Sequence, residues 1–333
     1  MPIEKQSGDT AVAERETGEA KKDIETVGRY KVEGEKQLGL VDTVATLEVG
    51  DGGNLKADEI KDVGKLKLES GSNCEAKKID TAFSRGAENS SLRADAADTL
   101  VYNGAEGSEL SIGEATDCVI RTEGTLDIKN VDGGVIREKG AGKDLEIDEF
   151  KNAVFFKESG NVKIGKTEEC VTKTGGNLEV GEASWSQLRT KDENASVGIE
   201  KMSDSTLRVA KGSEVNVKEA RDSVLNLSRE DIKAQVESAD GVAVSVGAGS
   251  EVTITDAKGC MFVVSEGGKV EITGEDQDNV YAASFSEAAE KMKGLLASKR
   301  EMRKQEMAEE YETDLEAMKK EKEDDLKKEL DSL

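Results

Sequence analysis

Pairs of apolar residues, separated by a single residue, recur along most of the chain at nearly constant intervals. Successive pairs begin 16 residues apart at their closest, from Leu110 to Leu126, and 19 at their widest, from Leu126 to Leu145. This interval is too short for the common helical repeats and is typical of one rung, a complete turn of a β-solenoid. The pairs are Leu55/Ala57, Cys74/Ala76, Leu92/Ala94, Leu110/Ile112, Leu126/Ile128, Leu145/Ile147, Val162/Ile164, Leu178/Val180, Val197/Ile199, Val215/Val217, Ala234/Val236, Val252/Ile254 and Val270/Ile272.

A second apolar column is expected nine or ten residues after the first in most rungs. Small residues recur between the two columns, five residues after the start of the rung. Because the side chains of a strand alternate between its two surfaces, both columns are expected to point inward. The second column comprises Phe83, Val101, Val119, Val135, Val154, Val171, Leu188, Leu207, Val224, Val244, Phe262 and Val280, and the small residues are Ala97, Ala115, Ala183, Ala220, Ala239 and Ala257.

These columns predict an all-β solenoid, a parallel β-helix, of about 13 rungs of ~18 residues each. Equivalent positions stack at about 4.8 Å per rung, so the rod would be roughly 60 Å long. One rung alone buries little apolar surface, whereas stacking buries a continuous core. The repeat assigns residues 44–283 to the solenoid domain.

Residues 1–43 lack the repeat and are rich in Glu, Lys, Thr and Gly. A segment of this composition is expected to be disordered, or to form a short helix over roughly 11–27 that caps the first rung. The Leu47/Val49 pair is expected to belong to an incomplete rung at this end.

Residues 284–333 are expected to form a long, charged α-helix. Ser284 is followed three residues later by Glu287, which is the signature of a capping box at a helix N-terminus. The apolar residues that follow keep helical spacing, which is compatible with a coiled coil, with docking on the solenoid or a partner, or with a solvated helix held by Glu–Lys pairs. The candidate assembly residues are Met292, Leu295, Met302, Tyr311, Leu315, Met318, Leu326 and Leu330.

The formal net charge is −24, from 47 Lys and Arg against 71 Asp and Glu. Nucleic acids and anionic membranes attract clustered basic residues, so this balance argues against both as partners. No stretch approaches the 18 or so apolar residues that span a bilayer, and residues 1–10 carry no apolar signal core. The expected location is the cytoplasm, and the expected partners are proteins or further copies of this chain.

The chain contains no histidine, which removes the commonest general base, the Ser-His-Asp and Cys-His arrangements, and most zinc sites. No glycine-rich segment has the spacing of a phosphate-binding loop. Neither catalytic residues nor a cofactor or metal is therefore expected.

The four cysteines are expected to be free, buried thiols. Cys118, Cys170 and Cys260 each lie eight residues after a rung start, in a column of small residues, and Cys74 lies in the first apolar column. The nearest two of the shared column are three rungs apart, about 14 Å at the stacking distance. A disulfide requires Cα atoms within about 7 Å, so none is expected.

The stacked Leu, Ile and Val columns over residues 55–280 resemble the bactofilins, cytoskeletal proteins whose β-helical rods polymerise end to end. This resemblance implies a structural or scaffolding protein that assembles, or binds protein partners, through its faces and C-terminal helix. The alternatives are a polysaccharide-active β-helix enzyme and an adhesin or fibre shaft. Such enzymes carry long loop insertions, which these uniform rungs lack, although Tyr102, Phe155, Phe156 and Trp185 are aromatics that could line a sugar cleft.

Overall fold

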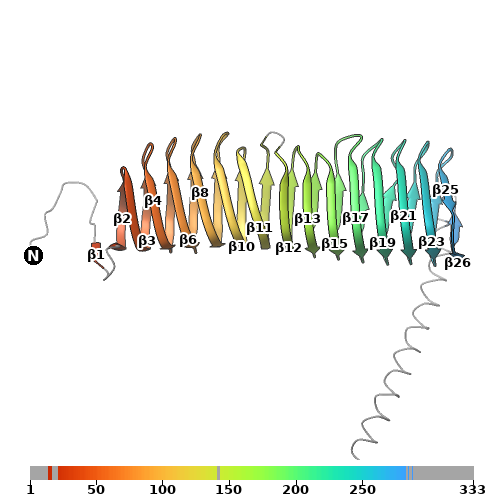
Figure 1. The fold of residues 1–333 in the computed structure, drawn as a ribbon, viewed down its shortest axis with the longest axis horizontal. Coiled ribbons are helices and arrows are strands. Elements are labelled where there is room, and N and C mark those ends of the chain that lie inside the picture. Colours follow the sequence, from red (N-terminus) through yellow and green to blue (C-terminus); the bar gives the residue numbers. More distant parts are fainter. Residues whose placement is uncertain (1–13, 17–21, 141–142, 283, 285–286, 288–333) are drawn as a thin grey trace, which may run out of the picture.

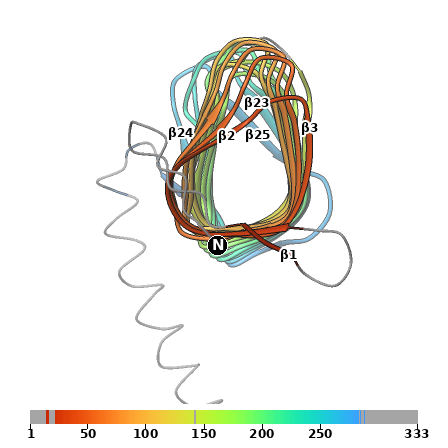
Figure 2. The ribbon, with the colours of Figure 1, turned by 90° about the vertical axis from the view of Figure 1, so that its left-hand side faces the viewer.

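The chain forms a parallel β-solenoid of about 14 rungs in a computed structural model. The structure describes residues 14–16, 22–140, 143–282, 284 and 287. From the side, the strands stand next to one another along a straight rod (Figure 1). Along the rod axis, the rungs superimpose as one closed, elongated loop (Figure 2). The predicted solenoid is confirmed, with one rung more than the thirteen expected.

Most rungs contain a first strand and a second strand joined at a sharp corner. The first strands are β4 (Asn54–Ile60), β6 (Asn73–Ile79), β8 (Ser91–Asp98), β13 (Val162–Glu168), β15 (Leu178–Ser184), β17 (Ser196–Ser203), β19 (Glu214–Arg221), β21 (Lys233–Asp240), β23 (Glu251–Lys258) and β25 (Lys269–Ile272). The second strands are β5 (Val63–Leu68), β7 (Ala82–Gly86), β9 (Leu100–Gly104), β14 (Val171–Thr174), β16 (Gln187–Thr190), β18 (Thr206–Arg208), β20 (Val224–Leu227), β22 (Ala243–Val246), β24 (Met261–Val264) and β27 (Val280–Ala282).

The remaining strands either run through the corner or lie at the ends of the rod. The continuous ones are β2 (Lys22–Val32), β3 (Glu35–Val49), β10 (Glu109–Thr122), β11 (Thr125–Glu138) and β12 (Leu145–Lys157), and the short ones are β1 (Glu14–Glu16) and β26 (Asp276–Gln277).

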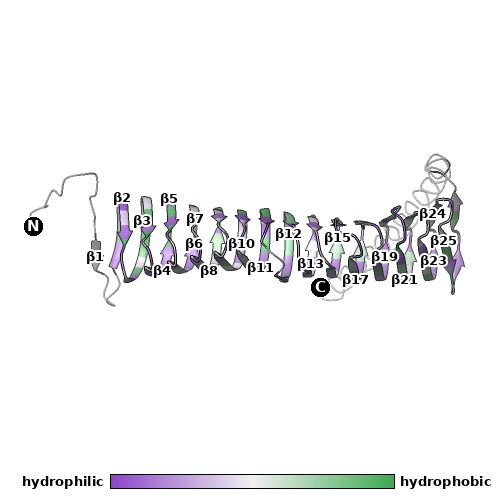
Figure 3. Ribbon diagram, turned by 90° about the horizontal axis from the view of Figure 1, so that it is seen from above, coloured by the Kyte–Doolittle hydropathy of each residue, from purple (hydrophilic) through white to green (hydrophobic). Residues whose placement is uncertain are grey.

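Parallel pairing stacks equivalent residues of successive rungs in columns. Leu110, for example, is paired with Leu92 on one side and with Leu126 on the other. The first apolar column is confirmed, because its members are buried up to Ile254 and partly buried in the last rung. The alanine column is buried as well. Hydropathy accordingly alternates along the strands (Figure 3), as expected where one surface faces the core and the other faces solvent.

A residue with positive φ forms the corner between the first and second strands in most rungs. Asp117 has a φ of 49°, Asn152 of 49° and Asp222 of 47°. Asp and Asn tolerate this left-handed conformation better than other residues that carry a Cβ. The corners also change the spacing of inward residues, since the buried Ile60, Val63 and Leu66 follow one another at intervals of three rather than two.

The solenoid begins earlier than the sequence predicts. Strands β2 and β3 occupy most of residues 22–49, so the domain boundary at residue 44 is wrong, and so is disorder or a helix across residues 22–43. In this first rung the buried Ile24, Val27 and Tyr30 are spaced by three because of the corners, a spacing that imitates a helix. Strand β1 pairs antiparallel with the start of β2 and shields part of the exposed edge.

At the other end, the first contact of the predicted capping box is present. The hydroxyl of Ser284 accepts a hydrogen bond from the backbone N–H of Glu287 at 3.3 Å. The rest of the segment expected to be helical, residues 288–333, lies outside the described residues, and all eight candidate assembly residues lie within it.

The second apolar column, predicted to point inward throughout, is wrong for most of its members. Leu188, ten residues after its rung start, is buried, whereas Phe83 and Val135, nine residues after theirs, are 59% and 39% exposed. A shift of one residue in a strand moves a side chain to the opposite surface, so the prediction combined two neighbouring columns. The inward column is Leu66, Ser84, Tyr102, Ile120, Ile136, Phe155, Thr172, Leu188, Leu207, Leu225, Val244 and Phe262.

All four cysteines are free and buried, as predicted. Cys118 pairs with Gly134 in the next rung, which places it in the expected column of small residues. Burial raises the pKa of Cys74 to about 12 and also raises the pKa of Cys118 and Cys170.

We therefore expect the native protein to react very slowly with a maleimide, because only an accessible thiolate reacts quickly. In denaturant, all four thiols should be labelled. Mass spectrometry of the labelled protein measures both states. Rapid labelling of several cysteines in the native state would contradict the register described above.

Among the residues that the structure describes, one ion pair is completely enclosed in the core. Glu138 and Lys157 are paired in neighbouring rungs, and the Lys157 Nζ lies 2.7 Å from the Glu138 Oε1. The two side chains are 2% and 0% exposed, and Glu138 Oε2 has no hydrogen-bond partner in the described structure. Burial raises the pKa of Glu138, and Lys157 offsets part of this effect. Thr122 and Thr174 continue the same column on either side of the pair.

Candidate interaction face

The second strands form one long face of the rod, on the side where Figure 2 labels β24. Each strand presents two outward positions on this face, separated by one inward position. Stacking turns these positions into two outward columns that run along the rod. We call this surface the second-strand face and describe its columns in turn.

One outward column is strongly basic, although the chain as a whole carries a charge of −24. It recurs once per rung, and seven of its nine consecutive positions are Lys or Arg. None of the nine is acidic. This basic column consists of Lys67, Arg85, Asn103, Arg121, Arg137, Phe156, Lys173, Arg189 and Arg208, each paired with the next.

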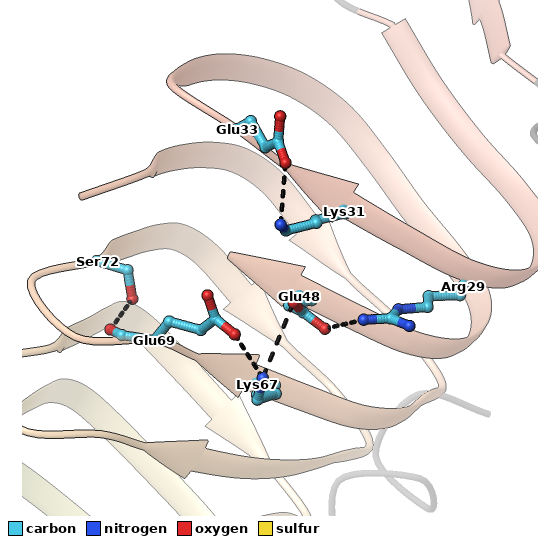
Figure 4. A network of polar contacts seen from close by, with 7 residues as sticks. All are labelled: Arg29, Lys31, Glu33, Glu48, Lys67, Glu69 and Ser72. Atoms are coloured by element: carbon cyan, nitrogen blue, oxygen red, sulfur yellow. Dashed lines mark hydrogen bonds and ion pairs between the residues drawn. The ribbon is translucent and has the colours of Figure 1, made fainter. Parts of the chain in front are cut away.

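At its N-terminal end the column is neutralised by acids. Glu48 stacks on Lys67, and its carboxylate lies 2.6 Å from Arg29 and 3.8 Å from Lys67 (Figure 4). Glu69 also contacts Lys67, and this hydrogen bond raises the pKa of the lysine. This end of the column is therefore internally balanced.

Further along, the positive charges are mostly unpaired. Within the described residues, Arg137 lies 3.6 Å from Glu158, and no ion pair is found for the other arginines or for Lys173. Three surface hollows open beside the column, lined by residues that include Lys67 and Arg85 in the first, Arg137 and Lys173 in the second, and Arg189 and Arg208 in the third. Their volumes are about 560, 350 and 440 Å³, respectively. The column is thus available to a negatively charged group from outside.

The other outward column is apolar over six consecutive rungs. It was predicted as part of the core, but two of its six members are exposed by more than a third and the other four are half-buried. Isolated exposed apolar residues are common, whereas a continuous exposed apolar patch marks an interaction surface. This apolar column consists of Phe83, Val101, Val119, Val135, Val154 and Val171. Val224 occupies the same column three rungs further on, beyond Gln187 and Thr206.

The corner that borders the face on the side away from the basic column is acidic. Each rung contributes two residues there, and seven of the nine rungs that form the basic column carry at least one acid. This acidic corner consists of Asp62, Asp80, Asp98, Asp117, Asp132, Glu168, Glu169 and Asp204. Across the face, the order is therefore acidic, apolar and basic.

The two rungs without a corner acid carry other residues. One has Lys151 and Asn152 at the corner, and the other has Ser184 and Trp185. Trp185 has a φ of 51° and is 65% exposed, so it lies at the corner and faces solvent.

The sequence contained a signal for the basic column that was missed. Lys or Arg lies eleven residues after six of the thirteen rung starts, for example Arg121 after Leu110 and Arg189 after Leu178. The net negative charge concealed it, because local clustering does not depend on the overall balance. Of the aromatics considered for a sugar cleft, Tyr102 and Phe155 are buried and cannot contact a ligand on the surface.

Comparisons with known proteins leave this face without a precedent. No family model, no curated protein and no solved structure matches the chain. Over the part of the chain that the structure describes, no helix is long and apolar enough to cross a membrane. In the same part, Cys, Asp and Glu side chains form no group of three that could hold a metal ion.

Proposed function

We propose that this protein is a structural scaffold, a rigid rod that assembles with copies of itself or with protein partners through its second-strand face and its C-terminal segment. The observation that carries the proposal is the apolar column, which exposes β-branched and aromatic side chains along a continuous line on the outside of the rod. Burying this line against another protein removes apolar surface from water, which is favourable.

The uniformity of the rungs supports a structural role. Enzymes on this kind of fold build their sites from loops that project from the rod, because catalytic residues are usually positioned on loops by a rigid scaffold. Here the spacing of rung starts stays between 16 and 19 residues from residue 55 to residue 270. Stability then follows from contacts between neighbouring rungs, and the rod holds its two ends at a fixed separation.

The first test is the oligomeric state of the purified protein, with and without residues 284–333. Mass photometry and negative-stain microscopy should show a defined oligomer or filament for the full chain. A change of its size or shape after truncation would assign an assembly role to Met292, Leu295 and the other candidate residues of the C-terminal segment. Monomeric rods at all salt and protein concentrations would refute self-assembly and leave only binding to protein partners.

A further inference from the structure

The order of columns on the second-strand face makes it complementary to itself. Consider two copies whose second-strand faces meet and whose rods point in the same direction, related by a two-fold axis parallel to the rods. This rotation exchanges the two sides of the face without reversing the rod. The acidic corner of each copy then faces the basic column of the other, and the two apolar columns meet at the centre.

The complementarity extends to individual rungs when the copies are in register. Six of the nine rungs place a corner acid opposite a basic residue of the same rung in the partner, and in three of these six both groups lack an ion pair within the described part of their own chain. The pairs are Asp62 with Lys67, Asp80 with Arg85, Asp117 with Arg121, Asp132 with Arg137, Glu168 or Glu169 with Lys173, and Asp204 with Arg208.

The remaining three rungs are also matched. Asp98 faces Asn103, which can donate a hydrogen bond to a carboxylate. In the rung that has Phe156 in the basic column, the opposite corner residue is Lys151. In the rung with Trp185 at the corner, the opposite residue is Arg189. Both of these are cation–π combinations, with the aromatic residue in the basic column in one rung and at the corner in the other.

From this arrangement we propose that the chain forms a parallel, in-register homodimer through its second-strand face. The proposal rests on the self-assembly proposed above and specifies its geometry. The opposite, antiparallel arrangement is disfavoured because it places acid against acid and base against base. The contact area is also adequate. Over the nine rungs of the basic column the face is about 38 Å long and about 15 Å wide, so these rungs would bury on the order of 600 Å² per copy. The four further rungs up to β27 bring this to on the order of 900 Å², close to the roughly 800 Å² per partner of stable complexes.

Cross-linking between introduced cysteines tests the orientation. Phe83→Cys and Val224→Cys place thiols on the apolar column eight rung steps apart, about 38 Å, and the four natural thiols are buried. In a parallel dimer, each variant should be cross-linked to itself by a short bis-maleimide, and a mixture of the two should give no product that joins position 83 of one copy to position 224 of the other. Gln235→Cys, exposed on the first strands, is the matched control and should not be cross-linked.

Each other outcome overturns the proposal in an identifiable way. Cross-linking of Phe83→Cys to Val224→Cys would show an antiparallel contact. An oligomer that neither variant cross-links would show that assembly uses another surface; self-assembly would stand, but the second-strand face would not be its contact. A protein that remains monomeric at all concentrations would remove the dimer and the self-assembly part of the proposed function, and would leave only the binding of protein partners.

A charge exchange tests the individual contacts. Asp117→Lys places a lysine of one copy opposite Arg121 of the other, so two positive charges meet. Arg121→Asp places two negative charges opposite each other. Each contact occurs twice in a two-fold dimer. Each single variant should raise the dissociation constant of the dimer by roughly tenfold, and the double variant should restore it. Glu179→Lys, on the first strands, changes the net charge by the same +2 as Asp117→Lys and should have little effect. The intrinsic fluorescence of Trp185, the only tryptophan, reports association because the contact would cover its ring.

Failure of the double variant to recover would show that Asp117 and Arg121 do not face each other. A monomeric chain that binds dextran sulfate, and loses this binding in Arg121→Asp, would instead assign the basic column to a linear polyanion.

Discussion

We expect the Glu138→Leu variant to lose about 3–5 kcal/mol of folding free energy, because it leaves a buried ammonium group without its partner. Lys157 is 0% exposed in the core, and the described structure gives it no second carboxylate. The midpoint of urea denaturation, followed by circular dichroism, measures the loss.

The double variant Glu138→Leu/Lys157→Met separates the ion pair from the packing of the site. Apolar replacements of a buried ion pair are often neutral or stabilising, so most of the stability should return. The exposed pair of Lys163 and Glu146, 2.6 Å apart, is the matched control. Glu146→Gln should change stability by no more than about 0.5 kcal/mol, because exposed pairs contribute little. A small effect of Glu138→Leu would mean that water reaches Lys157.

The Gly134→Ala variant should lose at least about 3 kcal/mol, through backbone strain combined with a backbone clash. Gly134 has a φ of 100°, and a Cβ there would lie 2.0 Å from the carbonyl oxygen of Cys118 in the preceding rung. That carbonyl belongs to the residue paired with Gly134, so neither group can move without separating two rungs. Urea denaturation again provides the measurement.

Two other glycines separate strain from clash. Gly34 has a φ of 71° with nothing within 4 Å of an added Cβ, so Gly34→Ala should lose only about 1 kcal/mol. Gly198 lies in strand β17, and its nearest neighbour would be a side-chain carbon of Glu179 at 3.9 Å. Gly198→Ala should therefore gain a few tenths to about 1 kcal/mol. If Gly134→Ala resembled Gly34→Ala, the two rungs would be less tightly packed than described.

The rod and its core were predictable because they depend on a repeated pattern. The prediction used the interval of 16 to 19 residues and the apolar pair at each rung start, such as Leu110/Ile112. Both arise whenever each rung buries the same positions. The free, buried cysteines followed from the same stacking argument, since equivalent positions three rungs apart cannot approach each other. These inferences depend on the average length and pattern of a rung, and not on the exact register of any single rung.

The residues of the interaction face could not be predicted in this way, because a shift of one residue along a second strand decides which side chains point outward. Val135 and Ile136 are both apolar, and only the pairing of β11 with its neighbours shows that the first points outward and the second inward. The corners cause this ambiguity, because they replace the strict alternation of a strand by intervals of three. The same intervals hid the first rung, where Ile24, Val27 and Tyr30 imitate a helix.

The sequence by itself therefore determined the repeat, the identity of the first buried column and the absence of histidine chemistry. Only the tertiary structure decided which residues share an outer column, because Arg121 and Arg137 become neighbours through hydrogen bonds between strands and not through proximity in the chain. It likewise brought Glu138 and Lys157, nineteen residues apart, into one enclosed contact. The amino-acid sequence determines the net charge, but the pairing of strands between rungs determines which charged residues become neighbours.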